Sequence, residues 1–277
     1  MGFMGKLICA VALAVVTTGA FAQAEDKLIL DGSTTVGPIA KAFAEYYMKQ
    51  NPGVEVSVSE SGSGNGAKSI INGACDIGCM SRFMKEKEFK AAAEKGVHPV
   101  PYAIAMDGIA PVVHPSNPIA EITVDQLKKI YKGEIKKWSE LGGPDKPIVV
   151  ISRDTNSGTY ETWEKLVMSK EKIVGSAEYA TSNGAVRARV QNTPYAIGYV
   201  GVGFIDKTVK ALPVDGIKPS VKAVTSGAYP IARNLYMMTA GEPKLGSHTH
   251  RYISLYLTPE GQQIIEDIGY VPVTEYK

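Results

Sequence analysis

The sequence is poor in cysteine and histidine, with only 3 and 4 of its 277 residues. Cys9 lies in an apolar N-terminal run, which leaves Cys75 and Cys79 for the rest of the chain. Their C-x3-C spacing has no second cysteine pair and no nearby histidine, which argues against a zinc or redox site. On an extended strand at ~3.3 Å per residue their Cα atoms would lie about 13 Å apart, too far for a disulfide. We therefore predict two buried free thiols.

Sequence motifs of catalysis are also missing. There is no G-x-S-x-G nucleophile elbow and no P-loop ending in Gly-Lys-Ser/Thr. His248 and His250 form a His-x-His pair without an evident third metal ligand, so we expect a surface role for them. We expect no catalytic residues, no cofactor and no metal, and a serine hydrolase is the weaker alternative.

Charge of one sign is not in excess. The chain has 30 Lys and Arg against 28 Asp and Glu, a formal net charge of +2. General nucleic-acid binders usually carry a basic surplus on one face, so we do not expect nucleic acid as a partner. No second long apolar run follows the N-terminal one, and we expect a soluble mature protein.

The N-terminus has the layout of a secretory signal peptide. Lys6 precedes an apolar run over residues 7–16, and Ala22-Gln23-Ala24 matches an A-x-A cleavage site. The run is shorter than the roughly 20 residues that span a bilayer, which disfavours a membrane anchor. We predict a signal peptide over residues 1–24, cleavage near Ala24 and export.

Strand and helix patterns alternate along the remaining chain. Ser33 and Thr34 are predicted N-caps of a helix that follows a buried strand at 27–30. The repeated strand-helix-strand order predicts an α/β fold with largely parallel strands. The helix should bury Val36, Ile39, Ala40, Phe43 and Tyr47. Further strands are predicted at 54–58, 75–80, 109–113, 148–151, 196–200 and 236–238, and helices at 124–131, 157–168 and 258–268.

Three loops join predicted strands to helix starts and share one chemistry: 31–35, 61–66 and 152–159. Each offers hydroxyl groups, small residues and backbone N–H groups at a helix N-terminus, which suits an anion. In open α/β sheets, ligands bind at the carboxyl ends of the strands. Arg153 adds a guanidinium that can hold an oxyanion with two hydrogen bonds. The alternative for Arg153 is a surface salt bridge with Asp154 or another carboxylate.

In this order and spacing the motifs resemble the periplasmic substrate-binding protein of the high-affinity phosphate ABC transporter, in its shorter form. The resemblance covers essentially the whole mature chain. It implies a two-lobed periplasmic-binding-protein fold of type II, with the ligand cleft between α/β lobes joined by crossing strands. The motifs are GSTTVGP at 32–38, GSGNG at 62–66, ACDIGCMSR at 74–82, DGIA at 107–110, NP at 117–118, RDTNSGT at 153–159, AIGYV at 196–200 and TPEGQ at 258–262.

The resemblance also implies domain limits and partners. Lobe 1 would hold residues 25–107 and, after the chain returns, 229–277, and lobe 2 would hold 108–228. The implied ligand is inorganic phosphate, and the implied partners are the membrane permease subunits of an ABC importer. The protein would act in the periplasm as a monomer.

The family motifs carry over to a set of phosphate-binding residues. Longer members have an Asp after the strand at 75–80, where this chain has Ser81 followed by Arg82. That Asp accepts the phosphate proton and so disfavours sulfate. We expect Asp107 to take this role, with Asp31 and Asp154 as rivals. The other members of the set are Thr34, Thr35, Ser63, Arg153, Ser157, Gly158 and Thr159.

Two other functions stay open at this point. One is binding of a different oxyanion, such as sulfate, molybdate or tungstate. The other is hydrolysis of phosphate esters by a secreted enzyme, which would need an activated nucleophile or a metal set.

Overall fold

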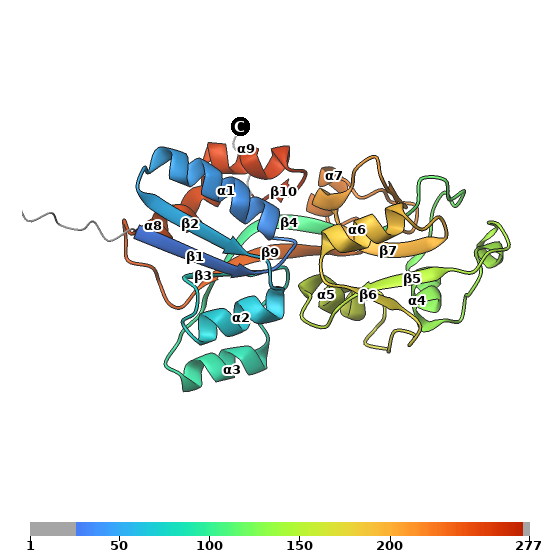
Figure 1. Ribbon diagram of the computed structural model, residues 1–277, viewed down its shortest axis with the longest axis horizontal. Coiled ribbons are helices and arrows are strands. Elements are labelled where there is room, and N and C mark those ends of the chain that lie inside the picture. The colour runs from blue at the N-terminus through green and yellow to red at the C-terminus, as the bar shows by residue number, and fades with distance from the viewer. Residues whose placement is uncertain (1–25, 274–277) are drawn as a thin grey trace, which may run out of the picture.

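A computed structural model describes residues 26–273, so the predicted signal peptide lies outside the described part. The chain forms two α/β lobes side by side (Figure 1). Within residues 26–273, no helix is long and apolar enough to cross a membrane. A two-lobed fold is what the sequence predicted.

Lobe 1 is built on three parallel strands, with β1 between β2 and β3. Helices α1, α8 and α9 cover one face of these strands, and α2 and α3 cover the other (Figure 1). The elements are β1 (Asp26–Gly32), α1 (Gly37–Gln50), β2 (Val54–Ser59), α2 (Ser63–Ile71), β3 (Ile77–Met80), α3 (Glu86–Glu94), α8 (His248–Ile253) and α9 (Pro259–Asp267).

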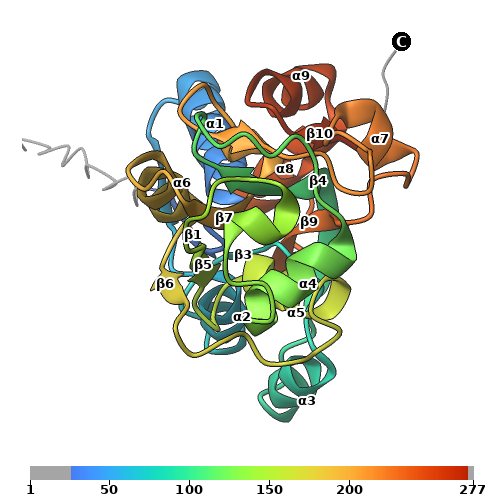
Figure 2. The same cartoon turned by 90° about the vertical axis from the view of Figure 1, so that its right-hand side faces the viewer.

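Lobe 2 is built on β5, which pairs in parallel with β6 and β7. Helices α4 and α6 lie on opposite sides of these strands (Figure 2). The elements are α4 (Val124–Lys132), β5 (Val149–Arg153), α5 (Gly158–Leu166), β6 (Glu178–Ala180), α6 (Asn183–Gln191), β7 (Ala196–Gly201), β8 (Lys210–Ala211) and α7 (Val221–Thr225), with short 3-10 helices at Trp138–Leu141 and Val202–Phe204.

Two strands, β4 (Val100–Val113) and β9 (Ala232–Thr239), run antiparallel to each other from one lobe into the other (Figure 1). The sheet order in the described chain is β2-β1-β3-β9-β4-β7-β5-β6, and β8 and β10 (Val271–Pro272) pair with β4. Because β3–β9, β4–β9 and β4–β7 are antiparallel, the prediction of largely parallel strands was wrong at the centre of the sheet. The boundaries at 107/108 and 228/229 stay predictions.

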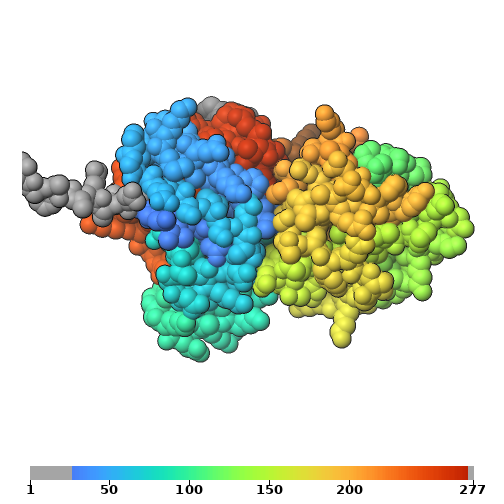
Figure 3. All heavy atoms as spheres, viewed as in Figure 1, coloured from blue at the N-terminus to red at the C-terminus, as the bar shows by residue number. Residues whose placement is uncertain are grey.

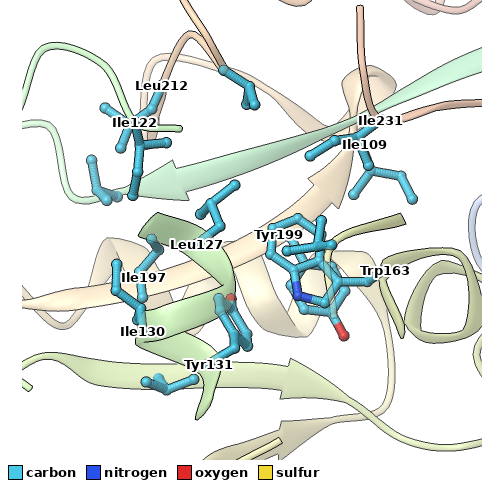
Figure 4. Packing of buried hydrophobic residues seen from close by; sticks show 14 of the residues in the cluster. Ile109, Ile122, Leu127, Ile130, Tyr131, Trp163, Ile197, Tyr199, Leu212 and Ile231 are labelled. Carbon is cyan, nitrogen blue, oxygen red and sulfur yellow. The ribbon is translucent and has the colours of Figure 1, made fainter. Parts of the chain in front are cut away.

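Each lobe has its own hydrophobic core. In lobe 2, the ring of Trp163 on α5 stacks on Tyr199 of β7, with centroids 4.2 Å apart and planes 8° apart (Figure 4). Tyr131 of α4 packs against both rings. The Tyr199 hydroxyl lies 2.9 Å from Ser152 Oγ and accepts a hydrogen bond from the backbone N–H of Arg153. The core therefore fixes the end of β5, where the predicted anion-binding loop begins.

The predicted helices and strands were found, and two local details differ from the prediction at α1 and β3. Helix α1 begins at Gly37, and its N-cap Val36 makes no side-chain cap. The Ser33 hydroxyl instead accepts from the N–H groups of Thr35 and Val36, within a turn before the helix. Strand β3 begins at Ile77, so Cys75 precedes it. Both thiols are free and buried, as predicted.

Candidate anion-binding site

The predicted site residues lie at the seam between the lobes. Figure 3 shows the lobes in contact along this seam. Lobe 1 contributes the turn before α1 and the start of α2, and lobe 2 contributes the starts of α5 and α6. The backbone N–H of Gly64 donates to the carbonyl of Asn156 across the seam, at 3.0 Å. Two helix N-termini from lobe 2 and one from lobe 1 therefore face one region, which favours negative charge.

Arg153 is a buried cation that forms no ion pair or hydrogen bond with a carboxylate among residues 26–273. Its side chain donates from Nε to the carbonyl of Ala180 and from Nη2 to that of Thr181, at 3.1 and 3.0 Å. The residue is 1% exposed, and Nη1 has no hydrogen-bond partner among the described residues. Burial, with a smaller contribution from Arg233, lowers the pKa of Arg153 to about 10. Such a charge calls for an anion.

Three threonine hydroxyls join the lobes beside Arg153. Thr34 Oγ1 accepts from Arg153 Nη2 at 3.3 Å, and Thr35 Oγ1 lies 3.0 Å from Thr159 Oγ1. Asn183, the first residue of α6, donates to Thr34 and Thr35 at 3.1 and 2.9 Å. All of these side chains are at most 5% exposed. The cluster therefore supplies hydroxyl donors from both lobes at one buried point.

Two serines of lobe 1 lie against the start of α5. Ser63 Oγ lies 3.2 Å from Ser81 Oγ and accepts from the Ser81 N–H at 3.0 Å. A Cβ on Gly158 would lie 2.5 and 2.6 Å from these two hydroxyl oxygens, so only glycine fits there. Ser157 caps α5, its hydroxyl accepting from the N–H of Tyr160. The structure thus brings these four predicted residues together.

Asp107 lies on β4 and pairs with Arg233, its register partner on β9. Arg233 Nε and Nη2 both donate to Asp107 Oδ2, at 3.0 and 2.8 Å, and the N–H of Val202 donates to Oδ1. Burial raises the pKa of Asp107, and Arg233 and the Val202 N–H act in the opposite direction. The Asp107 carboxylate thus already accepts three N–H hydrogen bonds. Its role as acceptor of the phosphate proton stays a prediction.

The remaining predicted residues lie beside the cluster. Arg82 donates to Glu88 from Nη1 and Nη2 at 2.8 and 2.7 Å, and its Nε lies 2.8 Å from Glu161 of α5. The Arg82 guanidinium is therefore held by two carboxylates and makes no hydrogen bond to the threonines among residues 26–273.

The two rival candidates for the proton acceptor also have hydrogen-bond partners. Asp31 accepts from the hydroxyls of Ser61 and Ser69, and Asp154 accepts from the N–H of Asn156.

Sequence reasoning missed Asn183 and Arg233. The segment Thr181-Ser182-Asn183-Gly184 is a fourth strand-to-helix junction with hydroxyl, amide and glycine residues, so the loop pattern already used would have found Asn183. Asp107 and Arg233 are each single charges within β4 and β9. A charge in a buried strand needs a partner, and this signal would have linked them.

No group of three or more His, Cys, Asp or Glu residues that could hold a metal ion occurs in residues 26–273. The donors of the site are guanidinium, amide, hydroxyl and backbone N–H groups, which are suited to an oxyanion.

Comparison with known proteins agrees with this geometry. A profile of the PBP superfamily domain matches residues 17–259. The phosphate-binding protein PstS of Bacillus subtilis is 36% identical over 259 residues, which cover 92% of this chain and 83% of the relative. The chain belongs to the PstS family of phosphate-binding proteins. Another member, PstS of Borreliella burgdorferi, is 31% identical, with 91% and 92% of the two chains covered.

Solved structures share the fold. A structure from Clostridium perfringens that contains bound phosphate has a TM-score of 0.84 and 32% identity, and the match covers 90% of this chain and 100% of that one. An ABC-type phosphate transport receptor from Vibrio cholerae has a TM-score of 0.72 and 28% identity, covering 88% and 99%. This family resemblance is the one expected from the motifs.

Proposed function

We propose that this protein binds inorganic phosphate at the seam between its lobes and delivers it to an ABC-type importer. The observation that carries the proposal is Arg153 of lobe 2, a guanidinium 1% exposed that donates to the Thr34 hydroxyl of lobe 1. Family membership supports the choice of phosphate over sulfate, molybdate or tungstate. The proposed phosphate ligands are Thr34, Thr35, Ser63, Ser81, Arg153, Ser157, Gly158 and Thr159. Arg82 and Asp107 lie beside them in ion pairs with Glu88, Glu161 and Arg233.

The protein acts without chemistry of its own. It is exported to the periplasm after cleavage near Ala24, and works as a monomer that meets the membrane permease subunits. Each lobe supplies some of the groups that contact the anion. The bound anion therefore favours the closed arrangement of the lobes.

Titration calorimetry with phosphate, sulfate, arsenate and molybdate tests the proposed ligand. We expect phosphate to bind much more tightly than sulfate and molybdate. Tighter binding of sulfate or molybdate would show that the site serves another oxyanion. N-terminal sequencing of the protein made by its native host should begin near Glu25, and a chain that still starts at Met1 would contradict export.

A further inference from the structure

Arg233 reaches the same cluster as Arg153 from a different element. Its Nη2 donates to Thr159 Oγ1 at 2.9 Å and to Thr35 Oγ1 at 3.3 Å, one hydroxyl from each lobe. The side chain is 5% exposed, and Nη1 is buried without a hydrogen-bond partner among the described residues. Arg233 therefore has one nitrogen on Asp107, one shared between Asp107 and the threonines, and one without a partner.

The charges around the cluster do not cancel. Arg153 is 1% exposed and the side chain of Arg233 5%. Among residues 26–273, Asp107, 0% exposed, is the one carboxylate that accepts a hydrogen bond from either guanidinium. Asp154 follows Arg153 in the sequence but gives its carboxylate to the backbone of Asn156. The two guanidinium groups therefore share one ion-paired carboxylate, and Nη1 of each has no hydrogen-bond partner among residues 26–273. A buried charge of this kind is stable only with a counter-ion.

Resting on the proposed function, we propose that Arg233 is a second anion-contacting residue and that Asp107 is the positioning residue that holds it. The two guanidinium groups approach the ligand from different elements, β5 and β9. Asp107 offsets one of the two positive charges and leaves the other for the anion. Asp107 acts through Arg233, and discrimination against sulfate does not depend on its carboxylate.

Measuring the phosphate affinity of Arg233→Gln by calorimetry tests whether Arg233 contacts the anion or only supports the fold. We expect phosphate to bind at least about 30-fold more weakly, as for other charge-assisted pairs to a desolvated ion. Arg233→Gln leaves Asp107 buried and unpaired, which by itself destabilises the fold. The double variant Asp107→Asn with Arg233→Gln removes both charges and should recover the melting temperature. If Arg233 contacts the anion, the double variant stays at least about 30-fold weaker.

The matched control is Arg189→Gln, because Arg189 makes the same two-nitrogen contact with Glu178 on the exposed surface. Its phosphate affinity should equal that of the unaltered protein. Full recovery of phosphate affinity in the double variant would overturn the proposal, since Arg233 would then serve only to neutralise Asp107. Failure of the unaltered protein to bind phosphate would instead contradict the proposed function.

Asp107→Asn alone tests the positioning role. It leaves Arg233 charged, so phosphate and sulfate affinities should shift together and their ratio should change by less than about threefold. A ratio that falls by about tenfold or more would make Asp107 the proton acceptor and overturn its role as a counter-charge.

Discussion

Arg82 of lobe 1 and Glu161 of lobe 2 form an ion pair across the seam, with Nε and Oε2 2.8 Å apart. Their side chains are 8% and 12% exposed. Lys85 Nζ lies 2.7 Å from the same Glu161 oxygen, and Glu88 pairs with the other side of the Arg82 guanidinium.

Glu161 belongs to the first turn of α5, whose start carries Gly158 and Thr159. The pair therefore ties closure of the lobes to the position of the anion-binding loop.

Glu161→Gln should open the seam more easily. A part-buried pair lies between exposed pairs and fully buried ones, so we expect a loss of about 1–2 kcal/mol in the closed state. Phosphate affinity should fall by about 5- to 30-fold, mainly through faster dissociation. Stopped-flow measurement of phosphate release gives the rate. The control is Glu171→Gln, which breaks an ion pair with Lys128 and Lys132 in lobe 2, and an equal effect there would exclude the seam as the cause.

Arg153→Ala should remove the guanidinium that the threonines face. Truncating one partner of a desolvated charge pair costs about 2–5 kcal/mol, so phosphate affinity should fall by about 30-fold to several thousand-fold. Arg153→Lys should also lose much of the phosphate affinity, because an ammonium cannot make the two parallel hydrogen bonds of a planar guanidinium. Calorimetry measures both variants, with the exposed Arg189→Ala as control. Binding within a few-fold of the unaltered protein would place the anion elsewhere.

Gly158→Ala should impair closure without unfolding either lobe. The added methyl group would clash with the hydroxyls of Ser63 and Ser81 on the opposite lobe. Overpacking costs about 1–3 kcal/mol, which corresponds to about 5- to 150-fold in phosphate affinity. Gly175→Ala is the control, since a Cβ there meets nothing within 4 Å. Unchanged affinity in Gly158→Ala would show that the lobes do not meet at this glycine when phosphate is bound.

The thiols should be unreactive in the native protein. Burial, with smaller contributions from Asp31 and Asp76, raises the pKa of Cys75 to about 12, and burial raises that of Cys79 too. The reactive thiolate is therefore scarce at neutral pH and should increase as pH rises toward 12. A thiol-disulfide exchange reagent at pH 8 should react slowly with the native mature protein, which lacks Cys9, and count two thiols after unfolding. Rapid native reaction at pH 8 would contradict the burial.

The sequence was a good guide to single elements and a poor guide to strand direction. Helix α4 was predicted at 124–131 and found at Val124–Lys132, because its apolar spacing and Thr123 cap are local signals. Strand β4 was predicted only at 109–113, whereas it runs over Val100–Val113. Its antiparallel pairing with β9 joins segments more than a hundred residues apart, and local patterns carry no information on such pairing.

For the site, the loop chemistry identified hydroxyls that the structure does bring together, with Thr35 and Thr159 as the clearest case. Arg82 shows the limit of this approach. Its position beside Ser81 suggested a ligand, but the carboxylates of Glu88 and Glu161, distant in sequence, hold its guanidinium. Only the folded chain shows which partner a charged side chain takes.

The two strands that connect the lobes should also determine which part of the site the anion meets first. An opening motion that bends β4 and β9 (Figure 1) would displace the ends of the lobes most and the connecting strands least. Asp107 and Arg233 are register partners on these two strands. Arg233 would then keep its position while the threonines and α5 separate. The approaching anion would meet a fixed positive charge before any hydroxyl surrounds it. Association should consequently slow as ionic strength rises, whereas the residence time of the ligand depends on the contacts that form afterwards.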